Sequence, residues 1–406
     1  MSTVAVIGAG AMGVGIAQTA AVSGWTVRLT DVSEEAARRG AAGIEQNLKR
    51  LTERGKLAPD AAAAAQSRIQ VAAAQRDLAD AELFVEAIVE DLQTKIEVLG
   101  ALTHLARPDA LFASNTSSLS ITRIGHGIGA ARRTVGMHFF NPVPLMPLVE
   151  VIAGQHTDAA AAERTFEIGR AWGKTPVRCR DTPGFIVNRV ARGYYLESLR
   201  MLGEGVAGLD EIDRSLKTLA GFRMGPFELM DLIGIDVNYT VSCSVWEQMG
   251  RPERLRPHAI QQSLFDSKQL GRKSGRGFYT HDGPAPLPAV SFERRSFDLS
   301  PRIYEAVRRV FDGATAGGAA AGGSSTEQYV VARVLAALIN EAHHALDEEV
   351  ATRGDIDTAM TLGTNWPRGP IAWAEQIGRH TVAALLAALD GASGDGRFAA
   401  ARSLTA

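Results

Sequence analysis

The sequence predicts an α/β fold: an N-terminal Rossmann-type, doubly wound sheet followed by an all-α C-terminal domain present as two tandem copies. Two observations predict this fold. Thr3–Ile7 is a β-branched strand that runs into a glycine-rich turn and a helix pattern, the opening of a dinucleotide-binding domain. Further on, residues 185–234 align without gaps to residues 329–378, each position matching the one 144 residues later.

Length, charge and cysteine content restrict the class of protein. The chain has 406 residues, enough for two or three domains, and its formal net charge of -2 gives no reason to expect a nucleic-acid partner. Cys179 and Cys243 stand far apart without a partner motif, which argues against a disulfide framework or a zinc site and suits a reducing compartment. No apolar run is long enough to span a membrane, and the first strand begins too early for a signal peptide. We therefore expect a cytoplasmic protein.

The glycine-rich turn at residues 8–13 reads G-x-G-x-x-G. The first glycine permits the tight turn, the second lets the backbone approach a pyrophosphate, and the third lets the helix predicted over 11–23 pack on the strand. The first turn of that helix offers N–H groups to the phosphates. The residues expected at the pyrophosphate are Gly8, Gly10, Ala11, Met12 and Gly13.

A second strand, Thr26–Thr30, ends at Asp31. A carboxylate in this place accepts hydrogen bonds from the adenosine ribose hydroxyls and repels a 2′-phosphate. The order of strand, helix, strand and acidic residue therefore predicts a site for NAD rather than for NADP.

The remainder of the N-terminal part alternates helix and strand patterns. Residues 32–58 form a polar helix whose end carries Arg54 and Lys56, which a solvated helix face would explain, and an alanine run at 61–65 continues a helical hairpin. The other elements expected here are strands at 68–71, 83–88, 111–113, 148–152 and 175–178, a strand from 134, and a helix at 160–172.

Polar residues follow two of these strands, at the edge of the sheet where doubly wound folds bind ligands. Glu90 follows the strand at 83–88, and Lys95 lies on the next helix. Residues 114–118, Ser-Asn-Thr-Ser-Ser, follow the strand at 111–113. This cluster could be a helix N-cap and nothing more, or it could present hydroxyl and amide groups to a nicotinamide and a substrate.

Residues 134–151 contain two strands separated by a proline-rich turn. The first strand breaks at Asn141, before a proline that cannot donate to a strand ladder, and the second begins at Leu148. Because a turn brings the ends of its strands together, we expect His138 to face Glu150. A histidine held by a carboxylate is suited to proton transfer, whereas the alternative is a half-buried histidine near a surface glutamate.

The sequence becomes helical after a break at 181–184. Asn188 lies in the first helical turn, where a buried amide is either structural or grips a ligand at a domain junction. Ala332 takes its place in the second copy, which suggests that this copy has a structural role. Matched positions include Arg189 with Arg333, Glu197 with Glu341, Asp213 with Asp357 and Gly225 with Gly369. The expected domains are 1–182, 183–281 and 326–406, with a linker at 282–325 that is Pro-rich at its start and Gly-, Ala- and Ser-rich, and therefore flexible, at 313–325.

Seven motifs in order carry a resemblance that covers nearly the whole chain except the linker. They are GAGAMGVGIA from Gly8, FVEAIVED from Phe84, SNTSSLSI from Ser114, GMHFFNPVPLMPLVEV from Gly136, DTPGFIVNR from Asp181, GPFELMDLIGID from Gly225 and GRKSGRGFY from Gly271. With them the sequence resembles the L-3-hydroxyacyl-CoA dehydrogenases of fatty-acid β-oxidation, including the 3-hydroxybutyryl-CoA dehydrogenases.

The resemblance implies NAD-dependent, reversible oxidation of an L-3-hydroxyacyl-CoA, so that the partner is an acyl-CoA thioester. It implies that His138 is the general base and that Glu150 orients and supports it. Ser117 and Asn188 would hold the 3-oxygen and the thioester region. The implied cofactor contacts are Asp31, Glu90, Lys95, Asn115, Ser117, Asn141 and Lys273. The candidates for the coenzyme A phosphates are Arg54 and Lys56.

The doubled helical domain departs from the short members of this family, which pair through a single one. Two copies in one chain could pack as an internal pseudo-dimer and give a monomer, with a homodimer as the alternative. The duplicated form is also similar to dehydrogenases of phenylacetate catabolism that act on 3-hydroxyadipyl-CoA. Arg223 is a candidate cation for the far carboxylate of such a substrate, although a solvated arginine is the simpler interpretation.

Two other functions share this pattern of residues. One is dehydrogenation of a free hydroxy acid such as L-gulonate, which would need no contacts to coenzyme A. The other is a non-catalytic, crystallin-like structural role. The intact set of Ser117, His138, Glu150 and Asn188 argues against the structural role, which needs none of them.

Overall fold

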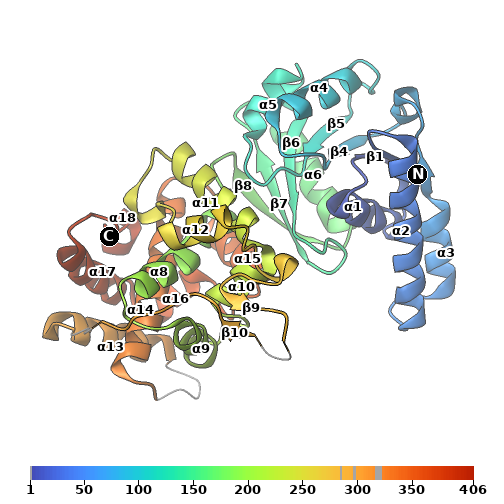
Figure 1. The fold of residues 1–406 in the computed structure, drawn as a ribbon. Coiled ribbons are helices and arrows are strands. Elements are labelled where there is room, and N and C mark those ends of the chain that lie inside the picture. Colours follow the sequence, from blue (N-terminus) through green and yellow to red (C-terminus); the bar gives the residue numbers. More distant parts are fainter. Residues whose placement is uncertain (1, 284–285, 296–298, 316–321) are drawn as a thin grey trace. The chain divides into compact units, whose positions relative to one another are not determined.

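The computed structural model describes residues 2–283, 286–295, 299–315 and 322–406. The chain divides into two compact units, Met1–Phe185 and Ile186–Ala406 (Figure 1). The division falls just after the expected boundary at residue 182. The Phe185 N–H donates a hydrogen bond to the Thr182 carbonyl (3.0 Å), which closes a turn at the end of the first unit.

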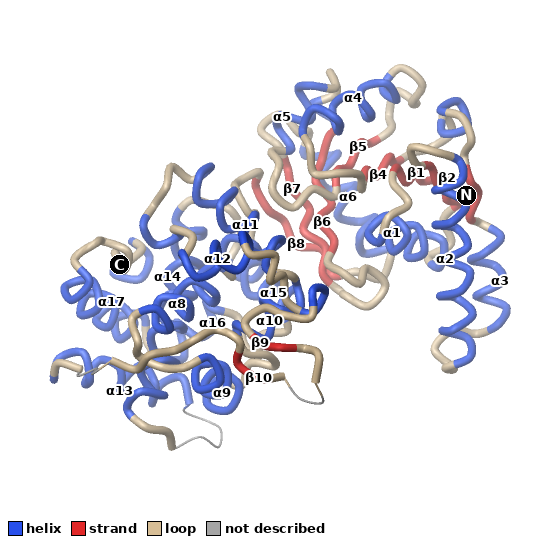
Figure 2. The backbone as a smooth tube through the Cα atoms, in the orientation of Figure 1, coloured by secondary structure: helices blue, strands red, loops and turns tan. Residues whose placement is uncertain are grey.

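The first unit is built on one eight-stranded sheet with the strand order β3-β2-β1-β4-β5-β6-β7-β8 (Figure 2). Its strands are β1 (Thr3–Ile7), β2 (Thr26–Thr30), β3 (Ile69–Val71), β4 (Leu83–Glu86), β5 (Leu111–Ser114), β6 (Thr134–Phe139), β7 (Leu148–Ala153) and β8 (Thr175–Arg180). Neighbouring strands are parallel except β6 and β7, which are antiparallel. The order changes direction between β1 and β4, so this is the switch point at which doubly wound folds bind ligands.

Helices connect these strands. They are α1 (Ala11–Val22), α2 (Glu34–Glu53), α3 (Pro59–Ser67), α4 (Leu92–Thr103), α5 (Ile121–Gly127) and α6 (Ala159–Ala171), with 3₁₀ turns at η1 (Gln75–Leu78) and η2 (Ala131–Arg133). Every residue of β1, β4, β5 and β6 is buried, which is why these strands read as continuous apolar runs rather than as alternating ones.

The second unit is helical apart from the two-residue strands β9 (Tyr279–Thr280) and β10 (Leu287–Pro288). Its first part contains α7 (Val187–Val190), α8 (Arg192–Gly203), α9 (Leu209–Ala220), α10 (Pro226–Ile233), α11 (Ile235–Gln248) and α12 (Ala259–Asp266), with η3 (Glu253–Leu255) and η4 (Arg272–Ser274). Its second part contains α13 (Pro301–Thr315), α14 (Ser325–Asp347), α15 (Arg353–Thr364), α16 (Pro370–Ile377), α17 (Arg379–Ser393) and α18 (Arg402–Thr405).

The spacing of 144 residues recurs in the local structure of the second unit. Asp213 on α9 accepts hydrogen bonds from two backbone N–H groups in the first turn of α10, at 3.0 and 3.1 Å. Asp357 on α15 does the same in the first turn of α16, at 2.8 and 2.9 Å. In both places a Cβ on the preceding glycine, Gly225 or Gly369, would lie 2.2 Å from the carboxyl carbon of the aspartate. Both turns therefore depend on the same glycine and the same carboxylate cap.

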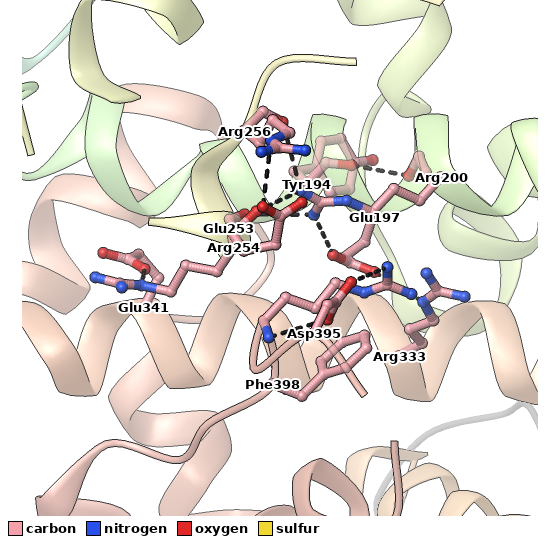
Figure 3. A network of polar contacts seen from close by, with 12 residues as sticks. Tyr194, Glu197, Arg200, Glu253, Arg254, Arg256, Arg333, Glu341, Asp395 and Phe398 are labelled. Atoms are coloured by element: carbon pink, nitrogen blue, oxygen red, sulfur yellow. Dashed lines mark hydrogen bonds and ion pairs between the residues drawn. The ribbon is translucent and has the colours of Figure 1, made fainter. Parts of the chain in front are cut away.

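Arginines and glutamates connect the two parts of the second unit in a reciprocal pattern. Figure 3 shows one half of it, with Arg333 beside Glu197. Arg189 on α7 and Arg333 on α14 are both buried, and each reaches carboxylates of the other part. The ion pairs are Arg189 Nε to Glu341 (2.7 Å), Arg189 Nη1 to Glu348 (2.6 Å), Arg333 Nε to Glu197 (2.8 Å) and Arg333 Nη1 to Glu204 (2.6 Å). The two parts thus hold each other through equivalent residues.

The expected linker at 282–325 contains a helix. The side chains of Val307, Val310 and Phe311 on α13 are buried, and α13 packs against α14 and α17. The sequence predicts no helix here, and the segment expected to be flexible, 313–325, overlaps α13 only at residues 313–315. The i, i+3, i+4 apolar spacing of α13 is that of an amphipathic helix, but it lies between Pro-rich and Gly-rich stretches that dominate the composition. Of the low-complexity segment 313–325, residues 316–321 lie outside the described part of the chain.

Within the described residues, no helix combines the length and the hydropathy needed to cross a bilayer. Cys179 is buried and Cys243 is partly buried.

Candidate active site

The glycine turn between β1 and α1 forms a cradle with space for a phosphate group. Gly8 has φ +105°, and a Cβ there would lie 2.4 Å from the carbonyl oxygen of Ala87. A Cβ at Gly13 would lie 1.8 Å from the Gly8 carbonyl oxygen, whereas a Cβ at Gly10 would meet nothing within 4 Å. No side chain caps the start of α1, so no capping side chain occupies the N–H groups of its first turn, which begins at Ala11. These features fit a dinucleotide pyrophosphate.

Asp31 lies directly after β2 and its carboxylate faces the glycine turn. It accepts hydrogen bonds from the N–H groups of Ala9 (2.5 Å) and Val32 (2.7 Å). Val32 is 98% exposed, and Val89, which follows β4, is 65% exposed. Two exposed valines that follow the strands on either side of β1 give a flat aromatic base an apolar surface next to an acceptor for ribose hydroxyls.

His138 and Glu150 are a cross-strand pair of β6 and β7, as the sequence predicts. The His138 Nδ1 atom lies 2.5 Å from Glu150 Oε2, with Glu150 fully buried and His138 6% exposed. The rings of Phe140 and Phe185 lie 4.6 and 5.8 Å from the imidazole, centroid to centroid. A carboxylate so close to Nδ1 favours the tautomer in which Nδ1–H donates and Nε2 carries the lone pair.

Glu90 organises the residues that follow β5. Its Oε1 atom accepts hydrogen bonds from the Thr116 hydroxyl (2.6 Å) and from the N–H groups of Ser117 (3.0 Å) and Ser118 (3.2 Å). Burial alone would raise the pKa of Glu90, but the Lys95 ammonium and the Thr116 hydroxyl outweigh it, so the pKa lies below its usual range. The polar cluster is therefore held as a turn by a carboxylate from the neighbouring strand.

Lys95 forms a buried ion pair that sequence reasoning missed. Its Nζ atom lies 2.6 Å from Glu86 Oε1 and 3.3 Å from Glu90 Oε2, and its side chain is 1% exposed. Glu86 also accepts a hydrogen bond from the Ser114 hydroxyl (2.6 Å). The available signal was an acidic residue at the end of the otherwise apolar strand Leu-Phe-Val-Glu. Because a buried charge needs a partner, that residue predicts a nearby cation.

Two further candidates lie near the His138 strand. Asn115 Oδ1 accepts a hydrogen bond from the Phe139 N–H (2.9 Å), which connects the end of β5 to the end of β6. Asn141 is exposed in the turn after β6. The first unit contains His138, Glu150, Glu90, Lys95, Asn115 and Ser117, of which Lys95 lies on α4 and the others lie on strands β6 and β7 or in the segments that follow β4 and β5.

The remaining candidates lie elsewhere. Asn188 is half-buried on α7 and Lys273 is on η4, both in the second unit, and Lys273 Nζ is 2.5 Å from Asp236 Oδ1. Arg54 and Lys56 are exposed at the end of α2. Over the described ranges, no group of three or more His, Cys, Asp or Glu side chains is arranged to hold a metal ion.

Comparison with known proteins agrees with this geometry. The family model "3-hydroxyacyl-CoA dehydrogenase, NAD binding domain" matches residues 3–182, and "3-hydroxyacyl-CoA dehydrogenase, C-terminal domain" matches both 184–281 and 329–405. The 3-hydroxyadipyl-CoA dehydrogenase of Escherichia coli K12 is 38% identical, over 98% of this chain and 95% of that protein. The mitochondrial hydroxyacyl-coenzyme A dehydrogenase of Rattus norvegicus is 41% identical, over 68% of this chain and 90% of that protein.

A solved structure gives the same result for the fold. The crystal structure of 3-hydroxybutyryl-CoA dehydrogenase from Escherichia coli K12 covers 100% of this chain and 97% of its own, with a TM-score of 0.88 and 37% identity. The predicted α/β fold class and the NAD cofactor are thereby confirmed. The chain belongs to the 3-hydroxyacyl-CoA dehydrogenase family of NAD-dependent oxidoreductases.

Proposed function

We propose that this protein oxidises the 3-hydroxyl group of an L-3-hydroxyacyl-CoA thioester to a ketone, reversibly and with NAD. The observation that carries the proposal is the His138–Glu150 pair. The pair lies near the carboxyl end of β6. Strand β1 of the same sheet leads into the glycine turn that fits a pyrophosphate. A buried carboxylate on Nδ1 gives the imidazole the orientation and basicity that a general base needs.

The reaction separates a hydride from a proton. Bound NAD supplies the hydride acceptor. His138 takes the hydroxyl proton on Nε2 as the C3–O bond becomes a carbonyl, because otherwise a protonated ketone would form. The Glu150 carboxylate stabilises the imidazolium through the 2.5 Å contact to Nδ1. In the reverse direction the same imidazolium returns the proton to the alkoxide.

The remaining residues orient the reactants. We assign Ser117 and Asn188 to the 3-oxygen and the thioester region, and Arg54 and Lys56 to the coenzyme A phosphates. The fixed turn around Glu90 supports this role for Ser117, because a positioned hydroxyl costs little further ordering. The proposed cofactor contacts are Gly8, Gly10, Ala11, Met12, Gly13, Asp31, Glu90, Lys95, Asn115, Ser117, Asn141 and Lys273.

The proposed function is tested by initial rates at 340 nm with NADH and a panel of substrates. The panel contains acetoacetyl-CoA, longer 3-ketoacyl-CoAs, 3-oxoadipyl-CoA and dehydro-L-gulonate, each repeated with NADPH. NADH-linked turnover of a CoA ester is the expected result. Turnover of dehydro-L-gulonate alone would mean that the substrate is a free hydroxy acid rather than a CoA ester. Binding of NADH without turnover of any substrate would indicate a non-catalytic role.

Asp31→Ser is expected to weaken NADH binding and to raise the affinity for NADPH relative to NADH by about tenfold or more, since charge-assisted hydrogen bonds are worth about 1.5–3 kcal/mol. The serine no longer repels a 2′-phosphate. The loss of the contact to Ala9 loosens the glycine turn for both cofactors, so the ratio of the two affinities is the informative quantity. Fluorescence titration measures it, with Asp60→Ser, an exposed carboxylate on α3, as the control. An unchanged ratio would remove Asp31 from the ribose site.

A dicarboxylic acyl group is the more specific substrate that we propose. The relative named 3-hydroxyadipyl-CoA dehydrogenase matches nearly the full length of this chain, including its second helical part. Arg223, exposed just before α10, is the candidate partner for the far carboxylate.

Arg223→Gln is expected to raise KM for 3-hydroxyadipyl-CoA about tenfold, as for the loss of one charge-assisted hydrogen bond. The KM for 3-hydroxybutyryl-CoA should stay unchanged, because that substrate has no distal charge, and it serves as the internal control. Equal changes for both substrates would exclude Arg223 as the residue that selects a dicarboxylic chain.

We also propose that residues 183–281 and 326–406 are tandem copies of one helical domain that pack as an internal pseudo-dimer in a cytoplasmic, monomeric protein. The reciprocal pairs of Arg189 and Arg333 support this arrangement, because each copy supplies the partner surface that another chain would otherwise supply. Light scattering with size-exclusion chromatography is expected to give the mass of one chain. A mass of two chains would instead support a homodimer.

A further inference from the structure

The turn between β6 and β7 is poor in backbone donors. We define the proline loop as residues 140–147, which include Pro142, Pro144 and Pro147. A proline has no N–H, and the N–H groups of Leu145 and Met146 are both directed to the Pro142 carbonyl, at 2.9 and 3.0 Å. The carbonyls of Val143, Met146 and Pro147 are instead bonded by donors from outside the loop.

Two consecutive residues after α6 supply those donors. Lys174 Nζ donates to the carbonyls of Val143 (2.5 Å) and Met146 (2.9 Å). The Thr175 N–H donates to the carbonyl of Pro147 (2.7 Å). The backbone of Lys174 is itself fixed, since its N–H donates to the Gly169 carbonyl (3.0 Å) at the end of α6. One side chain thus joins two points of the proline loop to a rigid helix end.

On its other side the proline loop packs against α1, the helix of the pyrophosphate cradle. Val143 is 2% exposed and belongs to the core of the first unit. A Cβ at Gly15 on α1 would lie 2.8 Å from the Cβ of Val143, so the loop and the helix approach as closely as a glycine allows. The proline loop is therefore packed against α1 through Val143 and held through its carbonyls by Lys174.

The state of Lys174 suits this role. Burial lowers the pKa of the Lys174 ammonium to about 8, so most of it is still protonated at pH 7. The carbonyls of Val143 and Met146 that it contacts are neutral, and ammonium-to-carbonyl bonds are stronger than bonds between neutral groups.

We propose that Lys174 is a positioning residue for cofactor binding. It holds the proline loop against α1, so that Asn141 and the end of the His138 strand keep their places beside the cradle. The contact of Asn141 with the cofactor rests on the proposed function, whereas the fixation of the loop against α1 does not. No atom of Lys174 takes part in the transfer of hydride or proton.

The test compares Lys174→Met, which removes the donors, with Lys174→Arg, which keeps a charged donor. Arg178→Gln is the matched control, because Arg178 lies on the adjoining strand β8 and makes an exposed ion pair with Glu163. For each variant NADH affinity is measured by fluorescence titration, kcat and the KM values by initial rates, and the unfolding temperature by calorimetry. Should the Met variant not fold, Lys174→Gln, which keeps one donor group, takes its place.

Lys174→Met is expected to weaken NADH binding about tenfold, in line with the loss of hydrogen bonds to a charged group. In the same variant the KM for NAD should rise by a similar factor and kcat should change by less. Lys174→Arg should recover most of the NADH affinity, and Arg178→Gln should bind NADH as the wild type does. Wild-type NADH affinity in Lys174→Met would overturn the proposal. The proposal would also be overturned if Lys174→Met lowered only the unfolding temperature and Lys174→Arg did not restore it. A wild-type protein that binds NADH but turns over no CoA ester would refute the proposed function and leave the NADH comparison valid.

Discussion

His138→Ala is expected to lower kcat by about 10²–10⁴-fold, the usual contribution of a positioned general base. The alanine leaves the hydroxyl proton without an acceptor, whereas the glycine turn that fits the cofactor does not involve this side chain. NADH affinity should therefore stay within a factor of about two, far less than the tenfold change that 1.4 kcal/mol would produce. Stopped-flow measurement of NADH oxidation separates the chemical step from product release.

Glu150→Gln tests the other half of the pair. A glutamine fills the same space but carries no charge to stabilise an imidazolium, so kcat should fall while the KM for the acyl-CoA changes little. Because the two residues act as a unit, the double variant should lose little more than His138→Ala alone. His126→Ala, an exposed histidine on α5, is the control and should match the wild type. If His138→Ala kept more than a tenth of the wild-type kcat, His138 would not be the general base.

The sequence predicts the His138–Glu150 pair because the proline break determines where two apolar strands turn back on each other. Alternation of side chains then leaves few registers in which both strands remain buried. The glycine turn is predicted for a similar reason, since its residues are consecutive and their backbone demands are local. Both features depend on neighbours in the chain, and the structure shows both.

The buried contacts of Lys95 and Lys174 could not be predicted in the same way. Each lysine reaches a partner from another element: Glu86 at the end of β4 in one case, and carbonyls of the proline loop in the other. A lysine in a polar segment is most often solvated, and only the packed fold shows that its side chain is covered. Helix α13 was missed for the opposite reason, because low-complexity flanks outweighed a local amphipathic pattern. The roles of Asn188 and Lys273 stay predictions.

Arg333→Met is expected to lower the free energy of unfolding by about 3 kcal/mol, the lower end of the range for removing one partner of a buried ion pair. Glu197, which is buried, loses Arg333 but keeps Arg200 at 2.5 Å, and for this reason the loss should not be larger. Arg189→Met should have a similar effect, because Glu341 likewise keeps Arg254 at 2.7 Å. Urea unfolding measures both losses.

The control for this pair of variants is Arg309→Met. Arg309 forms an exposed i, i+4 ion pair with Glu305 on α13, and such pairs contribute about 0–1 kcal/mol. Similar losses for Arg189→Met and Arg333→Met, against little for the control, would show that the two helical parts are held together by equivalent interactions. A loss for only one of them would mean that the reciprocal geometry is not matched by reciprocal energetics.

The effect of Arg333→Met should also depend on pH. Burial alone would raise the pKa of Glu197, but Arg200 and Arg333 outweigh it and lower the pKa to about 2, from an ordinary value of 4.5. A carboxyl whose folded pKa is depressed contributes stability that is fully present above the unfolded pKa and is lost as the pH falls through the folded pKa. The difference in unfolding free energy between wild type and Arg333→Met should therefore be constant from pH 7 to about 5 and shrink below pH 4.5. A difference that stayed constant down to pH 3 would mean that the arginine stabilises the fold through its packing rather than through the charge of Glu197.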